Sequence, residues 1–344
     1  MTTATVMGTT TAEAPPRTAL RQALAALTFH PGTTPSVSVG DRRVEGGSPR
    51  ELRIALGAAL YEEWHAGTEH DPARRRLPRR DPGFEARLTA AVPHASTPVA
   101  AMLRSPGQPT GPEAVVEIGR VLVRVPVERV RGAADAGPGD RVALDLPAVR
   151  PALSPGFLLV DGPVGSGTRG GNQELLRLYV HVADPEAAPR VWGALLEVLA
   201  DSGVPYRAKV LSRPWSYPRR DAVVVYLGAA HTAVTGALTS AARGLPGVGE
   251  AVSAFAHRVA PGVAVAWEPQ DGRPGWSDKS FGQHRAAAVA DGVVQHLTDP
   301  AASPLEEAVT EALRNASVVP DEPARNTGSP ALTGANTADA VRVG

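Results

Sequence analysis

The chain of 344 residues has 35 acidic and 35 basic side chains, and therefore no formal net charge at pH 7. A neutral chain of this length can bury a sizeable core, and its charge balance argues against broad, non-specific binding to nucleic acid or membranes. It has no cysteine, which excludes disulfides, thiolate nucleophiles, zinc ribbons and iron–sulfur clusters.

The two ends of the chain have the composition of disordered segments. Residues 1–15 are rich in Thr, Ala and Pro and lack the basic and apolar regions of a signal peptide, and residues 319–344 are similarly poor in apolar side chains. No apolar run approaches the length of a membrane span. We therefore expect a cytoplasmic protein with disordered ends that contacts neither membranes nor nucleic acid.

The first predicted part, residues 16–164, changes from helical to β patterning along its length. Apolar side chains at helical spacing predict helices around residues 20–27, from Ser48 to Trp64, and over residues 84–92. The basic run 74–80 is typical of a solvated surface, and a peptide- or partner-binding patch is the alternative. Alternating and β-branched residues then predict short strands at 115–118, 121–125, 142–146 and 157–160.

Residues 165–171 are rich in glycine and separate the two predicted parts. The segment lacks the Lys-Ser/Thr ending of a P-loop, and its glycine spacing does not fit the dinucleotide fingerprint. We therefore interpret it as a flexible connector rather than as a phosphate-binding loop.

The second part, residues 172–318, alternates strands with helices. Strands are predicted at 175–182, 206–211, 222–227 and 263–267, and helices at 188–201, 230–243 and 281–296. This order predicts an α+β fold, in which an N-terminal helical and β part packs on a C-terminal mixed α/β core.

Two strands of the second part place polar side chains in pairs. Tyr179 and His181 alternate along one strand, and Arg207 and Lys209 alternate along the next, so each pair should share a face. Lys209 is also unusual because the chain has only two lysines, and the other, Lys279, lies in a Gly/Pro-rich loop. A buried Lys can lose its proton, whereas Arg stays charged, so Lys209 is a candidate base.

Two further segments offer groups that suit an anion. Arg220 precedes the apolar strand that contains Tyr226, and Ser280, His284 and Arg285 lie at the start of a helix, where backbone N–H groups favour negative charge. Arginine matches phosphate in bidentate geometry, so the set suits a phosphorylated ligand.

The order and spacing of four segments resemble the lyases of class V lanthipeptide biosynthesis (LanY-type), which are related to a HopA-like type III effector family. The segments are RLYVH (177–181), VPYRAK (204–209), RRDAVVVY (219–226) and SFGQHR (280–285). The resemblance implies a phosphoserine/phosphothreonine lyase. Such an enzyme removes phosphate from a precursor peptide and leaves dehydroalanine or dehydrobutyrine. It implies a separate Ser/Thr kinase, which supplies the substrate as a partner or in a complex, and it requires no metal or organic cofactor.

The resemblance also suggests roles for the polar residues. More remote phosphothreonine lyases have Lys-x-His on the strand, where this chain has Tyr179 and His181. His181 is therefore the candidate acid, and Lys209 the preferred base, with Tyr179 as the alternative base and a phosphate or carbonyl contact as the alternative role of Lys209. The predicted phosphate-binding residues are the remaining polar groups, Arg220, Arg285, Arg207, Tyr226, Ser280 and His284.

A different class of function is compatible with the same residues. The chain would then be a non-catalytic phosphopeptide- or leader-peptide-binding partner of a biosynthetic kinase. Tyr179 in place of the family lysine is the feature that favours this alternative.

Overall fold

The computed structural model describes residues 16–30, 32, 36–68, 77–78, 80–106, 113–167, 174–301 and 303–332. These residues form seven α-helices and three antiparallel sheets, which confirms the predicted α+β class. The predicted disordered segment 1–15 and most of the basic run 74–80 lie outside the described residues. None of the described helices is long and apolar enough to cross a membrane.

A seven-stranded sheet forms the centre of the molecule, with the strand order β14-β15-β11-β13-β12-β10-β9. Its strands are β9 (Val149–Ser154), β10 (Phe157–Asp161), β11 (Leu175–Val182), β12 (Tyr206–Leu211), β13 (Arg219–Gly228), β14 (His257–Ala260) and β15 (Val263–Trp267). The predicted bounds of β11, β12 and β15 are confirmed, because each strand is a nearly continuous apolar or alternating run.

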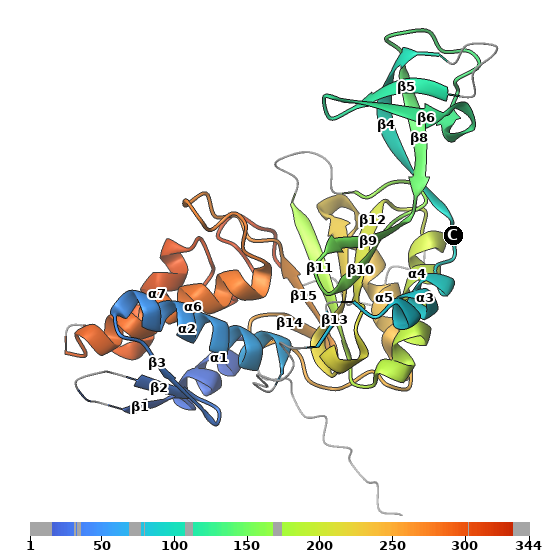
Figure 1. The fold of residues 1–344 in the computed structure, drawn as a ribbon. Helices are drawn as coiled ribbons and strands as arrows, with labels where there is room; N and C mark the ends of the chain where they lie inside the picture. Colours follow the sequence, from blue (N-terminus) through green and yellow to red (C-terminus); the bar gives the residue numbers. More distant parts are fainter. Residues whose placement is uncertain are drawn as a thin grey trace, which may run out of the picture.

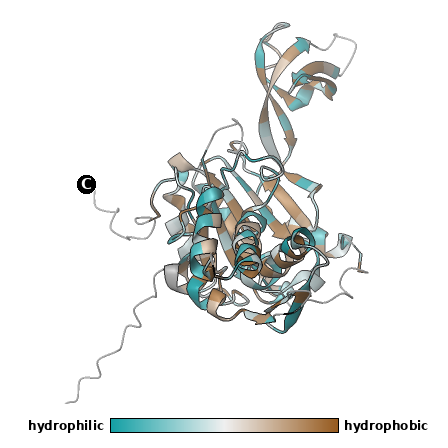
Figure 2. Cartoon of the chain, turned by 90° about the vertical axis from the view of Figure 1, so that its left-hand side faces the viewer, coloured by the Kyte–Doolittle hydropathy of each residue, from teal (hydrophilic) through white to brown (hydrophobic). Residues whose placement is uncertain are grey.

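Helices cover both faces of this sheet (Figure 1). On one side lie α3 (Pro82–Ala90), α4 (Ala188–Asp201) and α5 (Val234–Ala242), and the 3-10 turns η4 (Pro185–Ala187), η5 (Pro214–Ser216) and η6 (Ala229–His231) join neighbouring elements. On the other side lie α1 (Pro16–Ala25), α2 (Pro49–Leu60), α6 (Phe281–Thr298) and α7 (Leu305–Asn315). Viewed from that side, the polar surfaces of these helices face outward and the apolar sheet lies behind them (Figure 2).

The N-terminal helices belong to the same core as the sheet. Ser48 caps α2 by accepting a hydrogen bond from the Glu51 backbone N–H, as the sequence predicts. The π-helix η1 (Tyr61–Ala66) continues α2, and a small sheet of β1 (Thr28–His30), β2 (Ser36–Val39) and β3 (Arg42–Glu45) packs beside α2. Leu56 and Leu60 of α2 are fully buried in the main hydrophobic cluster.

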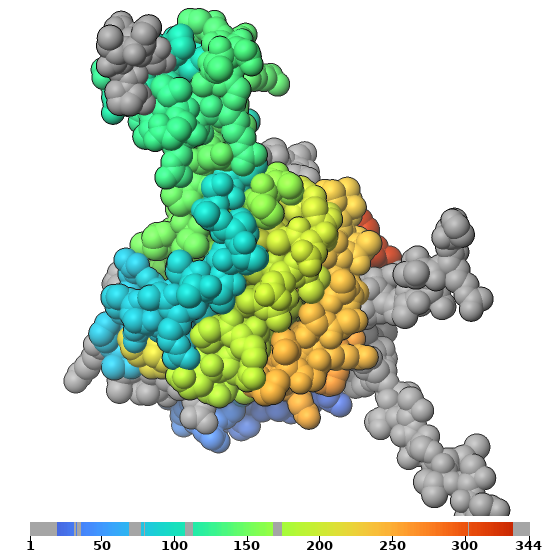
Figure 3. All heavy atoms as spheres, turned by 90° about the vertical axis from the view of Figure 1, so that its right-hand side faces the viewer, coloured from blue at the N-terminus to red at the C-terminus, as the bar shows by residue number. Residues whose placement is uncertain are grey.

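A five-stranded sheet stands apart from this body and has its own hydrophobic cluster (Figure 3). It is made of β4 (Ser96–Ser105), β5 (Glu113–Ile118), β6 (Val121–Pro126), β7 (Val130–Arg131) and β8 (Arg141–Pro147), with the turn η3 (Val127–Arg129) before β7. Strands β9 and β10, which follow it, return to the central sheet. The predicted division at residues 165–171 therefore does not separate two folded parts, because strands from both sides of it pair in one sheet.

The segment after residue 318 differs from the predicted disordered tail. Residues 319–332 pack against the central core, where Ala324, Asn326 and Leu332 are buried. The Trp267 N–H donates to the Ala324 carbonyl at 2.9 Å, and the Asn326 side chain donates to the Glu268 carbonyl at 2.6 Å. Composition alone missed this segment because its order comes from hydrogen bonds to β15 and α6 rather than from its own apolar residues.

Candidate functional site

Polar side chains form a row across the middle of the central sheet. The strand register places Arg177 of β11 and Arg207 of β12 opposite Tyr226 of the intervening strand β13. Since side chains alternate between faces, all three lie on one face. The next row on that face contains Tyr179 and Lys209, both opposite Val224. The face is the one turned toward α6 and η1, because the Tyr179 ring contacts Phe281 and His65.

Both arginines of the first row are fixed by carboxylates. The guanidinium of Arg177 forms a two-pronged ion pair with Glu268 and lies 5.0 Å from the centre of the Tyr226 ring. Arg207 donates to the two carboxylate oxygens of Asp161 at 2.7 and 3.2 Å. This arrangement holds each cation in place with its charge partly neutralised.

Lys209 differs from these arginines because no carboxylate among the described residues forms an ion pair with it. Its Nζ atom lies 4.3 Å from the centre of the Phe157 ring and 5.8 Å from that of Tyr226. Its side chain is half-buried. The ammonium group is therefore held by aromatic rings and remains available to a ligand.

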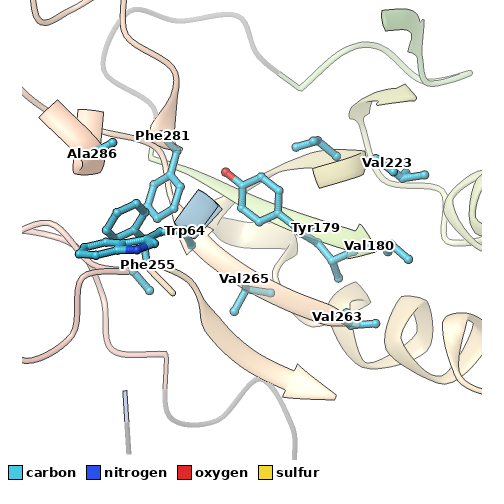
Figure 4. Close-up of a cluster of buried hydrophobic side chains, with 14 of the residues drawn as sticks. Trp64, Tyr179, Val180, Val223, Phe255, Val263, Val265, Phe281 and Ala286 are labelled. Carbon is cyan, nitrogen blue, oxygen red and sulfur yellow. The ribbon is translucent and has the colours of Figure 1, made fainter. Parts of the chain in front are cut away.

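Tyr179 is buried beside a cluster of aromatic side chains (Figure 4). Its ring centre lies 5.9 Å from that of Phe281 and 5.4 Å from that of His65. Its hydroxyl group has no partner with hydrogen-bond geometry among the described residues, although the Arg177 guanidinium lies near it. Burial raises the pKa of Tyr179 despite the nearby Arg177 guanidinium, so the phenol keeps its proton.

A second charged cluster, formed by Arg219, Asp221 and Tyr61, lies at the start of β13. Arg219 donates from Nε and Nη2 to the two carboxylate oxygens of Asp221, both at 2.7 Å, and from Nη2 to the Tyr61 hydroxyl at 2.9 Å. Burial opposes the charge of Asp221, but Arg219 holds the pKa of this carboxyl below its usual value. Tyr61 belongs to η1, so this cluster joins the N-terminal half to the sheet. The signal for this cluster in the sequence is the Arg219-Arg-Asp221 triplet, of which only Arg220 is predicted above as a phosphate-binding residue.

His65 of η1 lies against the same cluster. Its Nδ1 atom is 2.9 Å from the Ser253 hydroxyl oxygen, and its Nε2 atom is 3.7 Å from an Asp221 carboxylate oxygen. Burial and the neighbouring arginines lower the pKa of His65 to about 4, although Asp221 favours the proton. His65 is therefore neutral near pH 7.

His181 and Arg220 lie together at the end of β11, away from this row. A register shift follows Val180, and the His181 Nδ1 atom lies 3.1 Å from the Ala251 carbonyl oxygen, to which it can donate. Burial lowers the pKa of His181, and the charge of Arg220 adds to that effect. Arg220 donates to the carbonyl oxygens of Glu63 and Trp64 at 2.9 and 3.2 Å. No hydrogen bond or ion pair among the described residues joins either side chain to Lys209.

The predicted residues at the start of α6 have structural partners. Arg285 is fully buried and donates to Pro323 O, His284 Nδ1, Arg325 O and Asn326 Oδ1. His284 Nε2 lies 2.9 Å from Asp271, and burial lowers the pKa of His284 to about 4, which matches a neutral ring that donates to Asp271 and accepts from Arg285. The backbone N–H and the hydroxyl of Ser280 both donate hydrogen bonds to the side-chain oxygen of Gln283, in a cap at the start of the helix.

The placement of these groups differs from the predicted anion site. The structure brings Arg207, Lys209, Tyr179 and Tyr226 to one face of the sheet. It places Arg285 and His284 in a buried network instead, because their partners come from residues 271 and 323–326.

Comparison with solved structures finds two effector proteins of Pseudomonas syringae. That of pv. tomato strain DC3000 is 15% identical, with 81% of this chain and 90% of that chain covered and a TM-score of 0.45. That of pv. syringae strain 61 is 14% identical, with the same coverage and a TM-score of 0.44. No curated protein matches the sequence.

The family comparison covers the seven strands of the central sheet and helices α4 to α7. The model of the HopA1 effector protein family matches residues 148–325, more than half of the chain. The matched segment includes every site residue predicted from the sequence, and it excludes η1. The chain belongs to the HopA1 effector protein family.

Proposed function

We propose that the chain is a lyase that eliminates phosphate from phosphoserine or phosphothreonine of a precursor peptide, leaving dehydroalanine or dehydrobutyrine. The observation that supports this most directly is Lys209, an amine without a carboxylate partner among the described residues, on a sheet face that is rich in arginine. Such a face attracts a phosphorylated peptide, and such an amine can accept a proton.

The proposed reaction needs a base and a group that neutralises the leaving phosphate. Lys209 in its neutral form takes the proton from Cα, the electron pair forms the Cα–Cβ double bond, and the Cβ–O bond breaks with release of phosphate. Arg219 and Arg177 stabilise the developing negative charge. Tyr226 orients the Arg177 guanidinium, whose carbon lies 5.0 Å from its ring centre. His181 remains the proposed acid, with Arg220 beside it.

The proposal includes the source of the substrate. A separate Ser/Thr kinase phosphorylates the precursor peptide, and the lyase acts on the product of that kinase in the cytoplasm. No metal or organic cofactor takes part in the proposed steps.

The second candidate is a phosphopeptide-binding partner of a kinase, without chemistry of its own. One observation favours it: Tyr179 occupies the position of the base in the remote lyases, and burial raises its pKa, which disfavours a phenolate. Binding would use the same cationic face.

Mass spectrometry of a synthetic phosphoserine peptide incubated with the full chain distinguishes the two. The lyase gives a product lighter by one phosphoric acid, in the presence or absence of EDTA. A peptide that binds tightly but stays intact supports the binding partner. Phosphate release that leaves an intact serine contradicts the elimination.

A further inference from the structure

The π-helix η1 lies outside the segment matched by the family model, yet one of its side chains contacts a charged group of the site. The Tyr61 hydroxyl accepts a hydrogen bond of 2.9 Å from Nη2 of Arg219. The Nε and Nη2 atoms of Arg219 also donate to both carboxylate oxygens of Asp221. Asp221, on the same strand, therefore holds the Nε–Nη2 edge of the guanidinium. Tyr61, which lies 158 positions earlier in the chain, holds its Nη2 end.

The position of Tyr61 is itself fixed by contacts between η1 and the C-terminal core. The Ala254 N–H donates to the Trp64 carbonyl at 2.9 Å, and a hydrogen bond joins Nδ1 of the His65 ring to the Ser253 hydroxyl group. Gly282 of α6 leaves room for that ring, since a Cβ atom at this position would collide with it.

The third edge of the Arg219 guanidinium is not engaged. No described residue accepts a hydrogen bond from Nη1. The guanidinium carbon lies 5.9 Å from the centre of the Phe157 ring, the same ring that Lys209 approaches to 4.3 Å. Two cations with available N–H groups therefore lie around one aromatic ring, beside the row of Arg177 and Tyr226.

We infer that Tyr61 is a positioning residue of this site, which fixes Arg219 so that its Nη1 edge meets the phosphate of a phosphorylated peptide. A guanidinium held on two edges loses little freedom when the third edge binds an anion. The inference rests on the proposed function, because it takes the phosphorylated side chain as the ligand. It adds a residue of η1 to a site otherwise built from β10, β11, β12 and β13.

A double-mutant cycle on binding tests this role. The probe is a synthetic peptide with α-methylphosphoserine, which has no α-proton and cannot undergo elimination, and its unphosphorylated counterpart is the control. Tyr61→Phe should weaken binding of the phosphorylated peptide about three- to tenfold, the size expected for one hydrogen bond. Binding of the unphosphorylated peptide should not change. Arg219→Lys keeps a charge beside Asp221, and Tyr61→Phe added to it should cause no further loss.

Tyr206→Phe is the matched control variant. Tyr206 lies on the same sheet but on the opposite face, is fully buried, and has no hydrogen-bond partner for its hydroxyl among the described residues. Its removal should leave binding of both peptides unchanged. If Tyr61→Phe weakens both peptides equally, or lowers affinity by the same factor with Arg219 and with Lys at position 219, Tyr61 does not act through Arg219.

The test separates the inference from the proposed function. A wild-type chain that binds the α-methyl probe but leaves the phosphoserine peptide intact contradicts the lyase reaction, while the cycle still measures the coupling of Tyr61 to Arg219. Normal elimination together with unchanged affinity in Tyr61→Phe contradicts the inference and leaves the lyase reaction standing. A wild-type chain that neither binds nor reacts contradicts both.

Discussion

Lys209 and Tyr179 lie in the same row of the sheet, yet their surroundings differ in the property that matters for a base. The Lys209 ammonium contacts two aromatic rings and no described carboxylate, whereas the Tyr179 hydroxyl is buried without a partner and its pKa is raised by burial. A phenol whose pKa is raised by burial disfavours the phenolate that would have to take the α-proton, so burial counts against Tyr179 as the base.

Substitution of these two residues should separate their roles. Lys209→Met is expected to remove nearly all elimination, whereas Tyr179→Phe should keep near-normal kcat/KM, because it removes only a hydroxyl without a hydrogen-bond partner among the described residues. Both are measured with a phosphoserine peptide by mass spectrometry. Abolished elimination in Tyr179→Phe, with peptide binding intact, would instead identify Tyr179 as the base.

Arg285 illustrates how burial changes the meaning of a charged residue. Its guanidinium donates to four acceptors, three of them in residues 323–326. Arg285→Ala should therefore lower the free energy of unfolding by about 3–5 kcal/mol, the usual cost of breaking a buried charged network. Urea denaturation measures this change. Wild-type stability combined with lost phosphopeptide binding would restore the phosphate-binding role predicted from the sequence.

At the scale of elements, the spacing of apolar residues correctly predicts those helices and strands whose formation depends on nearby residues. Strand β11 and helix α4 have the predicted bounds because their apolar spacing fixes both the element and its buried face. The pairing of Tyr61 with Arg219 could not be predicted, because no spacing rule relates residues that meet only after the chain has folded. The role of Arg285 could not be predicted for the same reason. Its position in a helix is as predicted, but three of its hydrogen-bond partners come from a segment predicted to be disordered.

The contact between η1 and α6 depends on the absence of a side chain at Gly282. Gly282→Ala would push a Cβ atom into the buried His65 ring, and overpacking of this kind costs about 1–3 kcal/mol. Thermal unfolding should show the loss, and a His65→Ala background should reduce it, since the colliding ring is gone. An equal loss in both backgrounds would mean that another contact is responsible.

The whole molecule keeps two buried histidines neutral, and its stability should therefore depend on pH. The pKa values of His65 and His284 are both lowered to about 4, first of all by burial, while an unfolded histidine titrates near 6.5. The unfolded chain then binds more protons between these values, so stability is present above pH 6.5 and is lost as the pH falls toward 4.

The size of this loss follows from the two pKa values. Between pH 7.5 and pH 5 each histidine should lower the free energy of unfolding by about 2 kcal/mol. Urea titrations at the two pH values measure the sum. A constant free energy of unfolding over this range would show that neither ring is held neutral by the fold.

The packing of residues 319–332 has a consequence for the order in which the chain matures on the ribosome. Synthesis proceeds from the N-terminus, so α6 leaves the ribosome before the three acceptors of Arg285 that lie in residues 323–326. Until residues 323–326 leave the exit tunnel, burial of the Arg285 guanidinium would leave most of its N–H groups without acceptors, which is unfavourable. We therefore expect α6 to dock only loosely until residues 323–326 have emerged, and the site that faces α6 to be complete only then.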